Sequence, residues 1–207
     1  MIKKTEQKIK DAALAVFIQK GFVNCTSREI AREAGMNVAL VNYYFRSKSK
    51  LFALIFESVM QDFLKSMVQV FCSDLPFREK IRLLIEREFA FLAEHPEIPN
   101  FVLNELSRNP KAIEDMLPVL QMVDESGVFV EAKKLQSTGE MRSMDMVQIT
   151  LLIVSNCHYP FMAEPLMKVI HGVNDKEYKA QLKTHKTHVI SMILNYLFPN
   201  DKILLNA

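Results

Sequence analysis

The side chains with the most suggestive chemistry lie in NVALVNYYFRSK, residues 37 to 48. The amide of Asn42 both donates and accepts hydrogen bonds, which suits the edge of an adenine base. The hydroxyl groups of Tyr43 and Tyr44 and the ammonium of Lys48 suit phosphate oxygens. Residue types that fit base edges therefore stand beside types that fit a nucleic-acid backbone.

A short helix over residues 38 to 45 would divide this segment into two faces. Val41 and Phe45 are four residues apart and are expected to face the protein core. Val38 and Leu40 are left to contact thymine methyl groups, and Ala39 is small enough to let the backbone approach bases closely. The pattern predicts a recognition helix that enters the DNA major groove.

The elements needed to position such a helix precede it. Thr26 and Glu29 have the spacing of a capping box, which predicts a helix of about eight residues ending at Gly35. A three-residue turn follows, and Asn37 is the expected N-cap of the next helix. Two short helices joined through a glycine turn predict a helix-turn-helix. We predict DNA contacts from Thr26, Ser27, Arg28, Asn37, Val38, Ala39, Leu40, Asn42, Tyr43, Tyr44 and Lys48.

Residues 9 to 52 resemble the TetR family (TetR/AcrR type) of bacterial one-component transcriptional regulators. The resemblance is carried by Phe17, Gly21, Phe22, Thr26, Ile30, Ala31, Ala34, Gly35, Tyr43, Tyr44, Phe45, Lys48 and Leu51. Met36 replaces the usual valine, and Leu40 and Asn42 replace a usual serine or threonine and a usual tyrosine. The resemblance implies a homodimer, built through the last two major helices of each subunit, that usually represses and leaves DNA when a small molecule enters the C-terminal domain.

Composition and charge predict an all-α protein with two functional parts. Ten Lys and Arg face four Asp and Glu in residues 1–50, whereas sixteen face twenty in the remainder. We expect a DNA-binding domain over 1–48 and a helical effector-binding and dimerisation domain over 49–207. The N-terminus carries no signal-peptide core and no apolar run is long enough for a bilayer. We therefore expect a cytoplasmic protein with three free cysteines.

Proline and glycine positions predict the helices of the second part. A long helix from Ser47 should end before Pro76, and further helices are expected over 77–94, 99–108 and about 176–198. A break is expected at Gly127 within 113–137. Pro160 and Pro165 are expected to interrupt the chain after a strongly apolar helix from about 145.

The second part is also expected to bind a partner subunit and a ligand. Segments 145–170 and 178–198 are the interface candidates, with a buried core helix as the alternative for the first. The middle helices are rich in aromatic and methionine side chains, which can adapt to an irregular ligand. This predicts a site for an apolar or amphipathic effector, with ordinary core packing as the alternative. The predicted ligand residues are Phe63, Met67, Phe71, Phe89, Phe101, Met122, His158 and Phe161.

Other functions are less well supported by the sequence. An all-α di-iron enzyme would need Glu-x-x-His pairs, and neither these nor nucleotide-binding fingerprints occur. His185 and His188 are three residues apart without an evident third ligand, so no metal and no cofactor are predicted. A helical adaptor that binds protein through its N-terminal bundle is the main alternative to a DNA-binding regulator.

Overall fold

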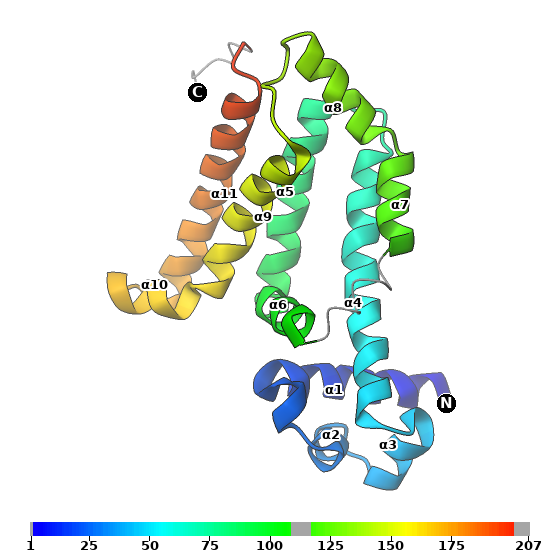
Figure 1. The fold of residues 1–207 in the computed structure, drawn as a ribbon. Helices are drawn as coiled ribbons and strands as arrows, with labels where there is room; N and C mark the ends of the chain where they lie inside the picture. The colour runs from blue at the N-terminus through cyan, green and yellow to red at the C-terminus, as the bar shows by residue number, and fades with distance from the viewer. Residues whose placement is uncertain (1, 109–116, 201–207) are drawn as a thin grey trace. The chain divides into compact units, whose positions relative to one another are not determined.

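A computed structural model describes residues 2–108 and 117–200, and all secondary structure in these ranges is helical (Figure 1). The helices are α1 (Ile2–Asn24), α2 (Ser27–Glu33), α3 (Val38–Phe45), α4 (Lys48–Phe71), α5 (Phe77–Glu94), α6 (Ile98–Arg108), α7 (Leu117–Glu125), α8 (Val128–Ser137), α9 (Met146–Met162), α10 (Glu164–His171) and α11 (Asp175–Leu197). The chain divides into an N-terminal unit, residues 1–62 with 100–116, and a C-terminal unit, residues 63–99 with 117–207.

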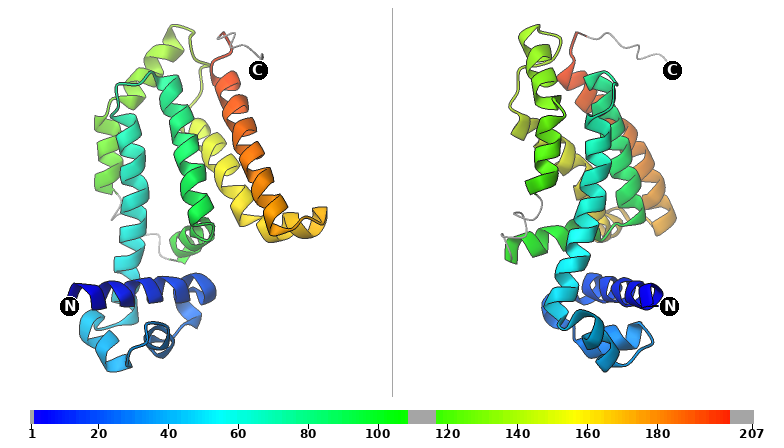
Figure 2. Two further views of the ribbon diagram at one scale, coloured as in Figure 1. Left: turned by 180° about the vertical axis from the view of Figure 1, so that it is seen from behind. Right: turned by 90° about the vertical axis from the view of Figure 1, so that its right-hand side faces the viewer.

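The N-terminal unit is built by α1 packing across α2, which in turn packs against α3 (Figures 1 and 2). Its core is the buried apolar faces of these helices and of the beginning of α4. An aromatic cluster joins Phe17 and Phe22 to Phe52, with ring centroids 5.0 and 4.8 Å from that of Phe52. The predicted domain boundary at 48 falls at the start of α4, whereas this compact unit continues to residue 62.

In the C-terminal unit, α5 packs against both α9 and α11, and these two helices also contact each other (Figure 2). Their buried faces form one hydrophobic core, to which α8 contributes Val128 and Ala132. The residues that fill the core centre include Ile85, Cys157 and Leu197, none of which exposes any surface. This three-helix arrangement positions the side chains considered below for ligand binding.

Most predicted helix boundaries are confirmed to within about two residues. Gly21 has φ 74° and interrupts α1, and Gly127 has φ 75° between α7 and α8. The expected break at Pro160 is wrong, because α9 continues through this residue to Met162. A proline so close to a helix C-terminus removes little from the hydrogen-bond ladder. None of the described helices is long and apolar enough to cross a membrane.

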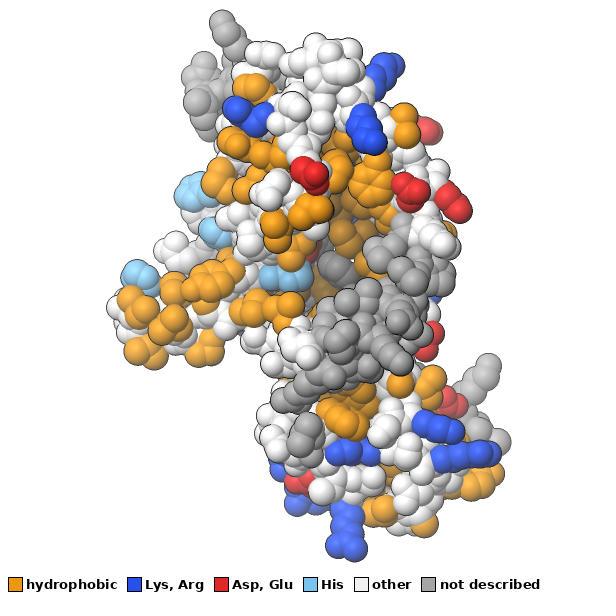
Figure 3. Space-filling model, viewed as in Figure 1, with side chains coloured by type: hydrophobic (Ala, Val, Ile, Leu, Met, Phe, Trp, Pro, Cys, Tyr) orange, Lys and Arg blue, Asp and Glu red, His pale blue; other side chains and the backbone are white. Residues whose placement is uncertain are grey.

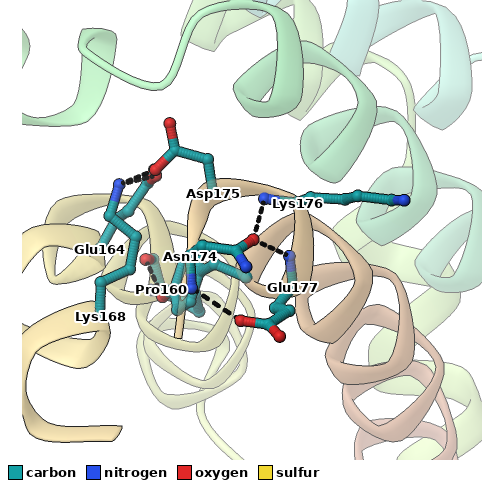
Figure 4. A network of polar contacts seen from close by, with 8 residues as sticks. Pro160, Glu164, Lys168, Asn174, Asp175, Lys176 and Glu177 are labelled. Atoms are coloured by element: carbon teal, nitrogen blue, oxygen red, sulfur yellow. Dashed lines mark hydrogen bonds and ion pairs between the residues drawn. The ribbon is translucent and has the colours of Figure 1, made fainter. Parts of the chain in front are cut away.

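A polar network fixes the corner formed by α9, α10 and α11 (Figure 4). Asn174 and Glu177 form a capping box at the start of α11. The ammonium of Lys168 lies 3.0 Å from Glu164 and 2.7 Å from Asp175, so it links α10 to α11 and lowers the pKa of Asp175. Tyr178 donates a hydrogen bond of 2.6 Å to the carbonyl oxygen of Pro160.

Candidate nucleic-acid interface

Helix α2 begins with the capping box that the sequence predicts. The Thr26 hydroxyl accepts from the backbone N–H of Glu29 at 3.2 Å, and the Glu29 carboxylate accepts from the backbone N–H of Thr26 at 2.8 Å. Lys20 of α1 donates to the same carboxylate at 2.6 Å. The Lys20 bond first, and the Thr26 bonds next, lower the pKa of Glu29 to about 2. The cap and the ion pair therefore fix α2 against α1.

Helix α3 has the two faces expected of a recognition helix. Val41 and Phe45 are buried, whereas Asn42 is exposed and Tyr43 exposes 79% of its surface. The Asn37 side-chain oxygen accepts from the backbone N–H of Leu40 at 2.8 Å, which confirms the predicted N-cap. The outer ridge of α3 therefore stands clear of the core residues that anchor it.

Lys48 has a structural role that the sequence did not predict. Its ammonium donates to the carbonyl oxygens of Phe22 at 2.7 Å and of Cys25 at 2.8 Å, and it lies 4.4 Å from the Phe22 ring centroid. Phe22 lies at the end of α1, after the break at Gly21, and Cys25 lies in the connection to α2. Two of the three ammonium N–H groups are thus used within the unit, and one remains for a phosphate oxygen.

The turn after α3 holds Arg46 in a strained backbone conformation. Arg46 has φ 59° and ψ −36°, and the Ser47 N–H donates to the Phe45 carbonyl at 2.6 Å across it. A γ-turn with positive φ is rare and strained for a residue with a side chain. The Arg46 side chain is exposed directly after the recognition helix. Arg46 was not among the predicted DNA contacts, although its positive charge at the end of the recognition helix could have indicated a phosphate contact.

The structure brings the predicted DNA-contacting residues together on α2, α3 and the start of α4. Each has an exposed or partly exposed side chain, although three of them also bond within the unit: Thr26, Asn37 and Lys48. Lys and Arg side chains gather over this unit in the space-filling view (Figure 3). Basic side chains exposed on this unit would attract a polyanion.

The predicted ligand residues are only partly brought together. Phe89 and Phe161 pack with ring centroids 5.9 Å apart, and they line one pocket. Met67 and Phe71 pack partly buried against the same core, but Met122 exposes half of its surface. The remaining two aromatic predictions are Phe101, which lies in the N-terminal unit against Phe52 and Phe56, and Phe63, whose side chain lies outside the described residues.

His158, the last of the predicted ligand residues, meets a buried acid. Its Nε2 lies 2.6 Å from Oε1 of Glu88, which is 97% buried in the apolar core. Glu88 Oε2 accepts no hydrogen bond from nitrogen or oxygen donors of the described residues. Burial raises the pKa of the neighbouring Cys157 thiol, and the Glu88 charge and hydrogen bond raise it further. Sequence reasoning missed Glu88, because nothing in its local pattern distinguishes it from a surface acid.

A second open pocket lies along α9, α10 and α11. Its volume is about 580 Å³, and His171, His185 and His188 are among its lining residues. His185 Nε2 lies 3.3 Å from the carbonyl oxygen of Asn156, and its ring packs against Phe89. Within the described ranges, no group of three or more His, Cys, Asp or Glu residues is arranged to hold a metal ion.

Comparison with protein families agrees with this architecture. Residues 9–55 match the family of bacterial regulatory proteins called tetR, and residues 78–193 match the tetracyclin repressor-like C-terminal domain. The second match alone covers more than half of the chain. The chain belongs to the TetR family of DNA-binding transcriptional regulators, which are not enzymes and which bind DNA operators and small effectors.

Two bacterial regulators are similar to this protein over parts of the chain. The HTH-type transcriptional regulator YttP of Bacillus subtilis (strain 168) is 27% identical over 57% of this chain. The chain spans 58% of the length of that relative. The HTH-type transcriptional repressor NicS of Pseudomonas putida is 26% identical over 75% of each chain.

Solved structures share the fold over nearly the whole chain. A TetR family regulator from Marinobacter aquaeolei VT8 has a TM-score of 0.71 at 13% identity, covering 96% of this chain and 99% of that one. The regulator FadR from Bacillus subtilis, solved in complex with stearoyl-CoA, has a TM-score of 0.61 at 18% identity, covering 92% and 98%. At these identities the likeness concerns the fold alone.

Proposed function

We propose that this regulator is a repressor that binds its operator as a homodimer and is released by a small apolar or amphipathic effector. The exposed outer face of α3 is the observation that supports DNA binding. Asn42 and Tyr43 are exposed there, while Val41 and Phe45 hold the helix to its unit. A helix presented in this way fits the major groove of B-form DNA.

We assign the contacts by chemistry. Asn42 is the base-reading residue. Val38 and Leu40 contact thymine methyl groups, and the small Ala39 between them lets the helix backbone approach the bases. Phosphate contacts come from the tyrosine hydroxyls and from the backbone and side chains at the start of α2, which are Thr26, Ser27 and Arg28. Lys48 contributes one N–H to phosphate and, through its bonds to Phe22 and Cys25, holds the α1–α2 connection in place.

Exposed apolar residues on α9 and α11 support dimerisation. Val147, Leu151 and Tyr159 of α9 each expose more than half of their surface, and Met192 and Tyr196 of α11 expose more than two fifths. Large exposed apolar side chains that gather on two packed helices are typical of protein–protein interfaces. Two copies related by a twofold axis would place two recognition helices about 34–36 Å apart, or a multiple of that, to match operator half-sites.

Two relatives support the regulatory part of the proposal. NicS is named a repressor, and FadR is crystallised with a long acyl thioester. Hydrophobic side chains also gather around a hollow in the C-terminal unit (Figure 3). An effector with an apolar body is the ligand that such a surface favours.

Titration against duplex DNA at several salt concentrations tests this proposal against a protein-binding adaptor. Several phosphate contacts predict that affinity falls on the order of 10³-fold or more between low and moderate salt, because counterions are released on binding. Binding that is absent or independent of salt would favour the adaptor. Fragments of the host genome selected by binding would supply the operator for the next step.

With an operator in hand, Asn42→Ala tests the base-reading assignment. The substitution is expected to relax preference at one base pair by about 1–3 kcal/mol while leaving other positions unchanged. Asn104→Ala, at an exposed position of α6, is the matched control. Unchanged selectivity in the Asn42 variant would show that this residue does not read a base.

A further inference from the structure

We infer that the pocket between α5, α9 and α11 binds a small organic anion with an apolar body. This deepens the effector part of the proposed function, and its binding test needs no DNA. The pocket has a volume of about 310 Å³, within the range of small-molecule sites. It lies wholly within the C-terminal unit.

The inner wall of this pocket is apolar and firmly held. Phe89 and Phe161 are each 4% exposed and belong to the hydrophobic core, so their ring positions are set by packing on all sides. Ala90 has only a methyl side chain and is exposed, which leaves room beside the rings, and the partly buried Leu182 of α11 also lines the pocket. An aliphatic or aromatic group can therefore be buried against this wall.

The rim of the pocket carries an excess of positive charge. Lys179, Lys183 and Lys186 lie four and three residues apart on α11 and all line the pocket. Within the described residues, neither Lys183 nor Lys186 forms an ion pair. The acid at this pocket, Glu164, is already paired with Lys168 of α10 at 3.0 Å. Like charges at this spacing repel one another, so an anion at the rim would relieve the repulsion.

The combination selects an anionic amphiphile over neutral or cationic molecules. An apolar wall next to the charges lowers the local dielectric, which strengthens the attraction of a carboxylate, sulfonate or phosphate to the lysines. A neutral molecule would gain only the burial of its apolar part. A cation would be repelled at the rim.

Calorimetric titration of the full chain with sodium octanoate tests the inference directly, with octanol and octyltrimethylammonium as uncharged and cationic analogues. Octanoate should bind more tightly than both, and its affinity should fall as salt is raised. Equal binding of octanoate and octyltrimethylammonium would overturn the inference. So would binding to phosphatidylglycerol vesicles without binding to octanoate, which would indicate a membrane surface instead.

Two variants assign the binding to this pocket. The double variant Lys183→Gln with Lys186→Gln should weaken octanoate binding about fivefold or more, whereas Lys176→Gln should not. Lys176 is on the same helix but outside the pocket, and its side chain points away from the Asn174 cap in Figure 4. Ala90→Leu should occupy part of the pocket and weaken binding, with Ala180→Leu at an exposed position of α11 as its control. Unchanged binding in either test variant would overturn the inference.

Failure of this inference can be told apart from failure of the proposed repressor function. If octanoate binds as expected but the protein does not bind DNA, the ligand site stands and the regulator assignment falls. If DNA binds with the expected salt dependence but octanoate does not bind, only the ligand class assigned to this pocket falls.

Discussion

The two units of this protein place their polar groups in different ways. In the N-terminal unit, polar side chains bond to groups nearby in sequence or to a neighbouring turn, as Thr26 does with Glu29 and Lys48 does with Phe22. In the C-terminal unit, buried polar groups join helices far apart in the chain. Glu88 meets His158 seventy residues later, and Lys80 meets Glu131 at 2.8 Å.

This difference matches two tasks: the N-terminal unit exposes a helix to a large partner, and the C-terminal unit can recognise a small ligand. The N-terminal unit uses local bonds to hold one short helix rigidly, with its reading side chains exposed to a large partner. The C-terminal unit instead leaves polar groups next to apolar walls, at Glu88 and at the lysines of α11. Such groups stabilise a fold poorly but can recognise a small ligand, because they are costly unless something satisfies them.

The largest effect on the free energy of unfolding is expected in the C-terminal unit, where removing His158 would leave the buried Glu88 without its partner. His158→Ala removes the nitrogen that lies 2.6 Å from a carboxylate with 3% exposure. Leaving this charge buried without its partner should lower the free energy of unfolding by about 3 kcal/mol in urea denaturation. His188→Ala, at an exposed position, should change it by no more than about 0.5 kcal/mol.

Replacing both partners makes the comparison sharper. The double variant Glu88→Met with His158→Leu should recover most of the lost stability, because no charge is then buried. If His158→Ala is as mild as His188→Ala, Glu88 is not left as a costly unpaired charge, and the contrast between the two units is wrong at this point.

The second prediction concerns the hydrogen bonds that the Lys48 ammonium donates within the N-terminal unit. Lys48→Met removes charged hydrogen bonds to the Phe22 and Cys25 carbonyls and should lower the free energy of unfolding by about 2 kcal/mol. Lys50→Met removes the same charge from the same turn at an exposed position. Equal stability of the two variants would show that the bonds to the connection contribute nothing.

DNA binding by the same two variants divides the roles of Lys48. Both should lower affinity for all sequences and reduce the salt dependence by up to about one charge. The Lys48 variant should lose more, because α2 and the α1–α2 connection are no longer held in place. A loss confined to particular operator sequences would contradict a phosphate-contacting and positioning role.

The N-terminal unit could be predicted from the sequence almost residue by residue. The cap at Thr26, the cap at Asn37 and the inward pair Val41 and Phe45 all depend on spacings of three or four residues, and each is confirmed. Local spacing fixes which side chains share a helix face, and helix caps are local by nature. Lys48 was missed as a structural residue because its carbonyl partners are more than twenty residues away.

The C-terminal unit could be predicted only as far as its helices. Phe101 and Phe89 look alike in sequence, but one packs against Phe52 in the N-terminal unit and the other against Phe161. Composition indicates which residue types line a ligand site, and it does not indicate which helices meet. The lysines of α11 were overlooked for the same reason, since a helix surface rich in lysine usually faces solvent alone.

The third prediction tests the local capping of α2. Thr26→Ala removes the hydroxyl that accepts from the Glu29 N–H and should lower the free energy of unfolding by about 1 kcal/mol. Thr26→Ser keeps the hydroxyl and is the control. A loss shared by both variants would point to packing of the threonine methyl group and not to the cap.

The same cap should also make the stability of the fold depend on pH in the acid range. Because the folded pKa of Glu29 is lowered to about 2, its ionised form stabilises the fold above its ordinary pKa of 4.5, and this contribution is lost as the pH falls toward 2. Thr26→Ala should raise the Glu29 pKa, as measured by carboxyl-carbon NMR, and Lys20→Met should raise it more because the Lys20 bond is the largest cause. An unchanged pKa in both variants would rule out this network.

The smallest effect, and the one of opposite sign, is expected at the turn after the recognition helix. Arg46→Gly relieves a backbone strained at φ 59° but adds freedom to the unfolded chain, so the free energy of unfolding should rise by only about 1 kcal/mol. Arg46→Ala loses the same charge and keeps the strain, so it should not be stabilised. If both variants bind DNA equally weakly and only the glycine variant is more stable, the strain and the charge are separate features of one residue. Equal stability of the two would mean that the turn is not strained in solution.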